Sequence, residues 1–189
     1  MPAAIIAKFE SPVSAAEFSV HVNDPIDHLT HCHQRIERSL VTVKNAVAAL
    51  RLTDPVLRTE GAAALDYELA LLQLLTDLHT QDEEESLFPR LRRSLVNDSD
   101  SLKELMLILE NQHRDKQALF RDLAVCLRRL PVTGDDGLEQ LESLVGQVEN
   151  IFRPHMMLED ERLMPKCRQS LTPADLTEMQ QEMRLRYKT

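Results

Sequence analysis

The chain of 189 residues carries a formal charge of −9 and 43% hydrophobic side chains, so it is long enough for one domain with a substantial core. With 28% charged residues, no Trp and only four Gly, the composition is typical of a soluble, mainly helical protein. The acidic balance argues against nucleic acid as a partner, because phosphate binding needs a basic face. No apolar run reaches the ~20 residues that cross a bilayer, so no membrane association is expected.

Cysteine usage and the first residues bear on the compartment. The three cysteines, Cys32, Cys126 and Cys167, lie far apart and form no CxxC, which indicates neither a disulfide framework nor a zinc ribbon. The first residues lack the charged region and the long apolar region of a secretory signal. A reducing, cytoplasmic setting is therefore predicted, with the cysteines as buried thiols.

Helix start and stop signals divide the chain into an arm and five helices. Asp24 before Pro25 predicts the first helix start, because Asp caps the free N–H groups and Pro fits the first turn. Apolar residues then recur at helical spacing along four long segments, which polar or Pro-containing turns separate. The predicted helices cover residues 24–52, 55–89, 101–130 and 137–164, followed by a short charged helix that Thr172 begins.

Four long amphipathic helices joined by short turns favour an all-α fold, namely an antiparallel up-down-up-down four-helix bundle with a short additional C-terminal helix. The predicted organisation is an N-terminal arm at 1–23, the bundle at 24–166, and a C-terminal helix at 167–189 packed on or beside the bundle. A ferritin-like carboxylate bundle is rejected, because it needs two ExxH motifs and only Glu110-xx-His113 fits.

Two copies of one motif suggest a metal site. HTQDEEESLFP at 79–89 returns as HMMLEDERLMP at 155–165, and both copies place a Glu four residues after the His and a Pro six residues later. Residues four apart lie on one face of a helix, about 6 Å apart along the axis, so the imidazole and the carboxylate can share a metal. The pairs His79 with Glu83 and His155 with Glu159 therefore predict two metals.

The other two long helices each offer a further imidazole. His33 shares a helix face with Ile26, Leu29, Ile36 and Leu40, whereas His28 and His31, like His21, are expected at the surface. His113 is the one His of the third long helix. In an antiparallel bundle the four imidazoles of His33, His79, His113 and His155 fall within roughly two turns of one level.

The choice of carboxylates follows from comparing the copies. Asp82 aligns with Leu158, whereas Glu83 aligns with Glu159, so the two glutamates are the predicted bridging ligands and Glu84 and Glu85 the solvated ones. Burying two carboxylates side by side is prohibitive unless cations neutralise them. Four imidazoles with two carboxylates suit Fe, Mn or Zn better than Mg or Ca.

These residues, with Leu87-Phe88-Pro89 ending the first motif, resemble the hemerythrin-like (HHE cation-binding domain) family over roughly residues 24–166. The resemblance implies an antiparallel four-helix bundle with two iron ions in a non-haem di-iron centre, with His33, His79, His113 and His155 as terminal ligands and Glu83 and Glu159 as bridges. Mn or Zn are possible substitutes. Family activities include oxygen binding, nitric oxide or redox sensing, and iron handling.

The chain departs from the oxygen carriers of that family at two points. Gln117 stands where they have a second His on the third helix, and His155-xxx-Glu159 replaces their HxxxxD. Glu37 or Glu110, a turn from His33 and His113, is a candidate for the missing ligand. The predicted function is binding of a diatomic ligand (O2 or NO) or a redox or iron response, by a monomer or homodimer. The alternatives are iron storage or donation and reduction of peroxide, O2 or NO with a partner reductase; no catalytic residue is assigned.

Overall fold

The computed structural model describes residues 23–94 and 100–187, so the predicted arm, with His21, falls outside the described residues except for Asn23. Every element in the described ranges is a helix, which confirms the all-α class. The elements in chain order are α2 (Pro25–Ala49), α3 (Pro55–Gln81), η2 (Asp82–Leu87), α4 (Phe88–Ser94), α5 (Asp100–Leu158), η3 (Glu159–Leu163), α6 (Met164–Ser170) and α7 (Pro173–Arg186).

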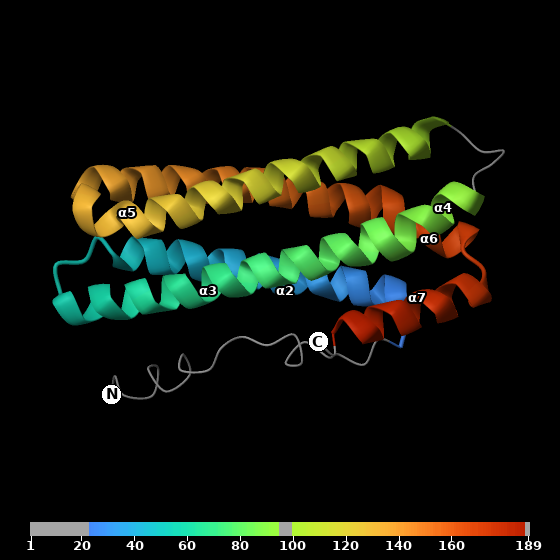
Figure 1. The fold of residues 1–189 in the computed structure, drawn as a ribbon, viewed down its shortest axis with the longest axis horizontal. Coiled ribbons are helices and arrows are strands. Elements are labelled where there is room, and N and C mark those ends of the chain that lie inside the picture. Colours follow the sequence, from blue (N-terminus) through green and yellow to red (C-terminus); the bar gives the residue numbers. More distant parts are fainter. Residues whose placement is uncertain (1–22, 95–99, 188–189) are drawn as a thin grey trace.

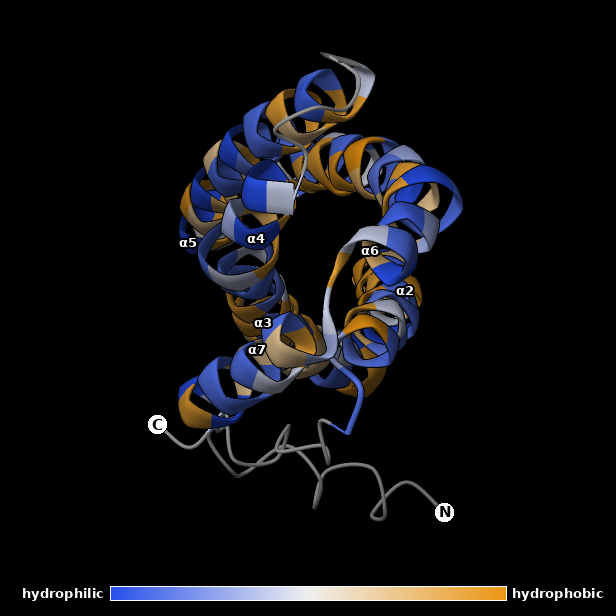
Figure 2. Ribbon diagram, turned by 90° about the vertical axis from the view of Figure 1, so that its right-hand side faces the viewer, coloured by the Kyte–Doolittle hydropathy of each residue, from blue (hydrophilic) through white to orange (hydrophobic). Residues whose placement is uncertain are grey.

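The long helices form two hairpins. α2 and α3 lie side by side, and α5 folds back on itself so that its two arms also run side by side (Figure 1). The reversal is at Gly134, whose φ of 58° lies in the left-handed region that favours glycine. Seen end-on, the helices surround a common interior (Figure 2).

Local sequence signals explain the helix starts. The Asp24 carboxylate accepts hydrogen bonds from the backbone N–H groups of Ile26 at 2.8 Å and Asp27 at 3.0 Å, which confirms the predicted N-cap.

α2 and α3 approach each other closely at Gly61, where a Cβ atom would lie 2.8 Å from Cβ of Ala49. Because Gly61 has no side chain, the two helices can make this close contact.

Both motif-bearing helices continue beyond the predicted stops at Pro89 and near Met164. They pass through the short π-helical segments η2 and η3 and go on as α4 and α6 to Ser94 and Ser170. The backbone N–H groups of Phe88 and Met164 bond to the carbonyls of Glu83 and Glu159, five residues earlier. This wider turn restarts the helix just ahead of each Pro, where the missing N–H is tolerated.

The apolar core is divided into two clusters by a buried polar layer. One cluster, which includes Ile36, Leu72 and Phe152, extends along α2, α3 and α5. The other, which includes Leu29 and Phe88, lies toward the end where α4, α6 and α7 meet, and α7 adds its buried methionines to it. No helix in the described ranges is both long and apolar enough to cross a membrane.

Candidate metal centre

The six residues predicted as metal ligands converge in the polar layer between the two apolar clusters. All of them are almost inaccessible to solvent, with side chains that the surrounding helices enclose; they are His33, His79, Glu83, His113, His155 and Glu159. Periodicity places each of them on the inward face of its helix, and the common level of the four imidazoles lets the rings meet in space. What the structure adds is the contact between the two hairpins.

The first half of the centre joins α2 and α3. The Nε2 atoms of His33 and His79 lie 3.0 Å apart. Oε2 of Glu159 lies 2.9 Å from Nε2 of His33 and 3.7 Å from Nε2 of His79. Glu159 belongs to the other hairpin, so a carboxylate of the second motif reaches into the imidazole pair of the first.

The second half joins the two arms of α5. The rings of His113 and His155 meet edge to face with centroids 4.9 Å apart. Oε1 of Glu159 lies 2.7 Å from Nε2 of His155, and Oε2 of Glu83 lies 3.2 Å from Nε2 of His113. Glu83 also lies 3.6 Å from Nε2 of His79, so each glutamate faces imidazoles of both hairpins.

These contacts define two overlapping groups that could hold metal ions. In the first group, ligand atoms of His33, His79 and Glu159 lie within 4.8 Å of one another. The second group is formed in the same way by Glu83, His113, His155 and Glu159. Two ions held by these groups would share Glu159.

The unsatisfied polar atoms of the cluster test whether a metal fits. Neither oxygen of Glu83 or Glu159 accepts a well-oriented hydrogen bond from the described residues, and Nε2 of His113 also lacks a partner there. Buried carboxylate oxygens are rarely left in this way, because each orphaned group is costly. Imidazole nitrogens and carboxylate oxygens that point together without hydrogen bonding fit a shared cation.

The outer ring nitrogens of three histidines are held by neighbouring side chains. Nδ1 of His33 donates to Asp160 at 2.9 Å, and Nδ1 of His113 donates to Glu84 at 2.7 Å. Asp160 follows Glu159 as Glu84 follows Glu83, so both motifs supply a ligand and then a support for an imidazole on another helix. Glu84 is therefore a positioning residue, although its side chain is 38% exposed, so the prediction that it is solvated holds in part.

Such outer partners fix the tautomer and orientation of a metal-binding His. Nδ1 of His155 lies 2.7 Å from Oε1 of Gln112, which accepts its hydrogen. In the neutral form of each of these three rings, the Nε2 atom consequently keeps its lone pair facing the interior. Nδ1 of His79 has no partner among the described residues.

The protein's own charges drive the pKa values of the two glutamates apart. Burial and the neighbouring Glu159 raise the pKa of Glu83 to about 8. For Glu159 burial acts in the same direction, but His155, His33 and His79 outweigh it and hold the pKa well below its usual value. Burial disfavours charge on His33 as well, yet Asp160 and Glu159 raise the pKa of this imidazole to about 10. Glu83 and His33 therefore hold their protons more tightly than usual, whereas burial lowers the pKa values of His79, His113 and His155.

Lys116 is a residue of the site that the sequence reasoning missed. It is buried, and its Nζ atom lies 2.9 Å from Nε2 of His155. Burial lowers the pKa of Lys116, against the attraction of Glu159 and Glu83. The sequence does indicate that Lys116 faces inward, because Leu109, His113, Lys116 and Phe120 follow one another at helical spacing. All four are buried in the structure.

The prediction that His28 lies at the surface is wrong, whereas His31 is exposed as predicted. α7 covers His28, whose ring meets Tyr187 edge to face with centroids 5.0 Å apart. The Tyr187 hydroxyl and Arg186 donate to the buried carboxylate of Asp82 at 3.0 and 2.6 Å. These contacts fix the C-terminal helix against the residue that precedes Glu83.

Glu37 and Glu110 do not join the cluster, so the expectation that one of them supplies a further ligand is wrong. Glu37 accepts a hydrogen bond from Arg153 at 2.9 Å, and Glu110 pairs with Arg92. Each carboxylate is thus held by an arginine near the surface, away from the imidazoles.

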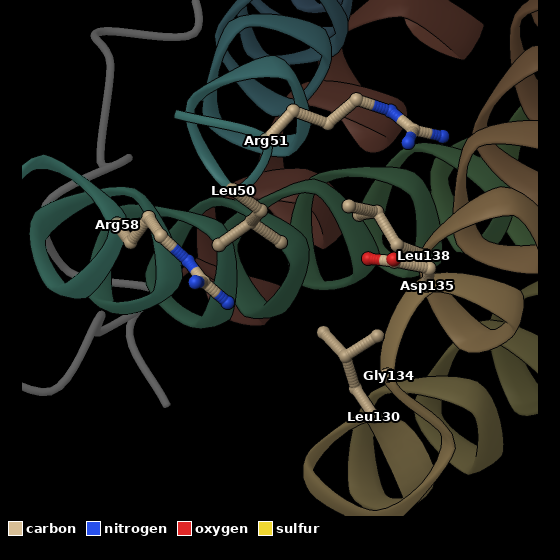
Figure 3. Close-up of a pocket in the computed structure, with 7 residues that line it drawn as sticks. All are labelled: Leu50, Arg51, Arg58, Leu130, Gly134, Asp135 and Leu138. Atoms are coloured by element: carbon tan, nitrogen blue, oxygen red, sulfur yellow. The ribbon is translucent and has the colours of Figure 1, made fainter. Parts of the chain in front are cut away.

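A separate pocket lies at the end of the molecule where α5 reverses (Figure 3). Its described lining has no imidazole or thiol, and it consists of Leu50, Arg51, Arg58, Leu130, Gly134, Asp135 and Leu138. It therefore takes no part in the candidate metal centre.

The fold and the site define an all-helical protein whose buried His/Glu cluster could hold a metal. The family model of the Hemerythrin HHE cation binding domain matches residues 24–167, and the chain belongs to this family. This match confirms the resemblance inferred from the two HxxxE motifs. A comparison with curated proteins found no significant match.

Proposed function

We propose that this protein binds two iron ions in a non-haem centre of an antiparallel four-helix bundle and takes up oxygen or nitric oxide there. The observation that carries the proposal is the overlap of two buried ligand groups at Glu159. Four imidazoles and two carboxylates are a donor set that suits iron, with Mn or Zn as substitutes. Iron supplies redox-active binding of a diatomic ligand when it is bound.

The chain's own residues hold and shield such a centre. His33 and His79 would bind one ion, His113 and His155 the other, with Glu83 and Glu159 between them. The two apolar clusters on either side exclude water from this layer, which strengthens the electrostatic attraction between carboxylates and cations. Asp160 and Glu84 keep two of the rings in position.

Metal analysis of protein grown with iron, combined with absorption spectra taken before and after exposure to air, tests the proposal. We expect about two iron atoms per chain and a spectral change that reverses when oxygen is removed. In the variant Glu83→Ala plus Glu159→Ala, the metal content should fall far below the wild-type value. Wild-type protein without any transition metal would refute the proposal.

Stopped-flow mixing separates binding from catalysis. A stable and reversible spectrum with oxygen or nitric oxide supports a binding protein. Repeated turnover of peroxide, oxygen or nitric oxide with added reductant would instead support an enzyme that receives electrons from a partner.

A further inference from the structure

Two consecutive acidic residues of η2 face different parts of the molecule. Asp82 and Glu83 are both inaccessible to solvent. Glu83 points into the candidate centre, where its carboxylate lies 3.2 Å from Nε2 of His113, whereas Asp82 points toward the end of α7. Because the peptide unit that joins the two residues is planar and stiff, a shift of Asp82 also moves the backbone that carries Glu83.

The C-terminal end of α7 holds η2 at several points. Nη1 of Arg186 donates to Oδ1 of Asp82 at 2.6 Å, and Nη2 donates to Oγ of Ser86 at 2.8 Å. Nε of the same side chain donates to Glu85 at 3.3 Å, and the hydroxyl of Tyr187 donates to Oδ2 of Asp82 at 3.0 Å. Three of the six residues of η2 are thus tied to one arginine.

This polar contact is additional to the apolar packing that seats α7. Met179 and Met183 are fully buried in the second apolar cluster, so α7 already has an apolar face against the bundle. In the second motif Leu158 stands where Asp82 stands in the first, and its apolar side chain offers no acceptor to an arginine. The contact with α7 therefore bears on Glu83 and has no counterpart at the residue before Glu159.

We propose that Arg186 and Tyr187 are positioning residues for the candidate metal centre. By holding Asp82 they fix the backbone of η2 and keep the carboxylate of Glu83 directed at the metals. This inference rests on the proposed function and specifies how α7 controls the retention of metal at that site. Because such coupling is reciprocal, metal that holds Glu83 also holds η2 against α7.

Transfer of ferrous iron from the loaded protein to a coloured chelator, followed in the absence of oxygen, tests this role. Arg186→Met removes the guanidinium and keeps most of the length of the side chain. Arg184→Met is the matched control, because Arg184 lies on the same helix, is exposed and loses the same charge. We expect iron release to be about 10-fold faster in Arg186→Met and to keep the wild-type rate in Arg184→Met. Arg186→Lys should release iron at an intermediate rate, since an ammonium group keeps the charge but lacks the planar fork that reaches both Asp82 and Ser86.

A double-mutant cycle separates positioning of Glu83 from general support of the fold. Asp82→Asn should speed iron release by itself, and adding Arg186→Met should have little further effect, because both changes break one contact. Amide hydrogen exchange supplies the reciprocal measurement. Exchange at the C-terminal end of α7 should be faster in metal-free than in metal-loaded wild type, and this difference should shrink in Arg186→Met.

The outcomes distinguish this inference from the proposed function. Wild-type protein that holds no metal refutes both. Loaded wild type and Arg186→Met that release iron at the same rate refute the positioning role alone, as do additive effects in the double-mutant cycle or equal acceleration in Arg184→Met. If Arg186→Met does not fold, Tyr187→Phe replaces it, since it removes only the hydroxyl, and iron release at the wild-type rate then refutes the role.

Discussion

Replacing Glu83 by Gln should have opposite effects on the metal-free and the metal-loaded protein. Gln has the shape of Glu but no charge to bury. In protein stripped of metal, Glu83→Gln should therefore raise the free energy of unfolding, because ionising the buried carboxyl of Glu83 next to Glu159 costs free energy. In metal-loaded protein it should lower stability and metal content, because a ligand is lost.

The magnitude follows from the pKa of Glu83. This pKa is raised from 4.5 to about 8 by burial and by Glu159, so the folded protein binds a proton that the unfolded chain releases. Stability of the metal-free protein consequently falls as the pH rises between 4.5 and 8 and is not affected by this group below that window. At pH 7 the cost is on the order of 3 kcal/mol, which corresponds to roughly 6–12 °C in Tm for a chain of this size.

The assay is thermal unfolding with chelator present, at several pH values between about 5 and 8. The gain in Tm of Glu83→Gln over wild type should grow with pH. Glu161→Gln is the control, because Glu161 is exposed in the second π-helical segment and the substitution is chemically the same. A gain that does not depend on pH, or a metal-free Glu83→Gln less stable than wild type at pH 8, would refute the reasoning.

Three further substitutions test the supports of the site and the packing around it. Asp160→Ala should weaken metal binding about 10- to 100-fold, since it releases an imidazole from its hydrogen bond; unchanged affinity in a competition titration with a chelator would contradict this role. Gly61→Ala should cost ~1–3 kcal/mol in urea unfolding, because its Cβ meets the neighbouring helix, whereas Gly146→Ala, where a Cβ meets nothing, should be neutral or stabilising. Equal stabilities of these two variants would speak against the close contact. Tyr187→Phe should cost roughly 1–3 kcal/mol, because the buried carboxylate of Asp82 loses a donor, and an unchanged urea midpoint would argue that this bond does not stabilise the fold.

Local signals were enough to predict the helix starts and the six inward candidate ligands. The Asp24 cap depends on neighbours within three residues, and the selection of His33 over His31 depends only on the helical repeat. The spacing of His79 to Glu83 likewise needs nothing but the geometry of one helix. For this reason the candidate ligands that the structure brings together are the ones that periodicity selects.

Contacts between helices could not be predicted in the same way. His28 looked exposed on its own helix, and its burial depends on how α7 packs against that face. Glu84 looked solvated because its partner, His113, belongs to another hairpin. The π-helical segments were missed as well. Pro89 and Pro165 are typical of helix ends, and only the shifted backbone hydrogen bonds of the preceding turn show that the helices continue past them.

The sequence by itself determined the all-helical class and the set of imidazoles and carboxylates on inward faces, because these follow from repeats of three and four residues along one chain segment. Only the tertiary structure decided which glutamate reaches which imidazole, how α7 covers Asp82, and that Lys116 meets His155. Those contacts join residues up to 126 positions apart, as in the contact of Glu159 with His33. They depend on the relative position and rotation of whole helices, which the burial of both apolar clusters fixes together.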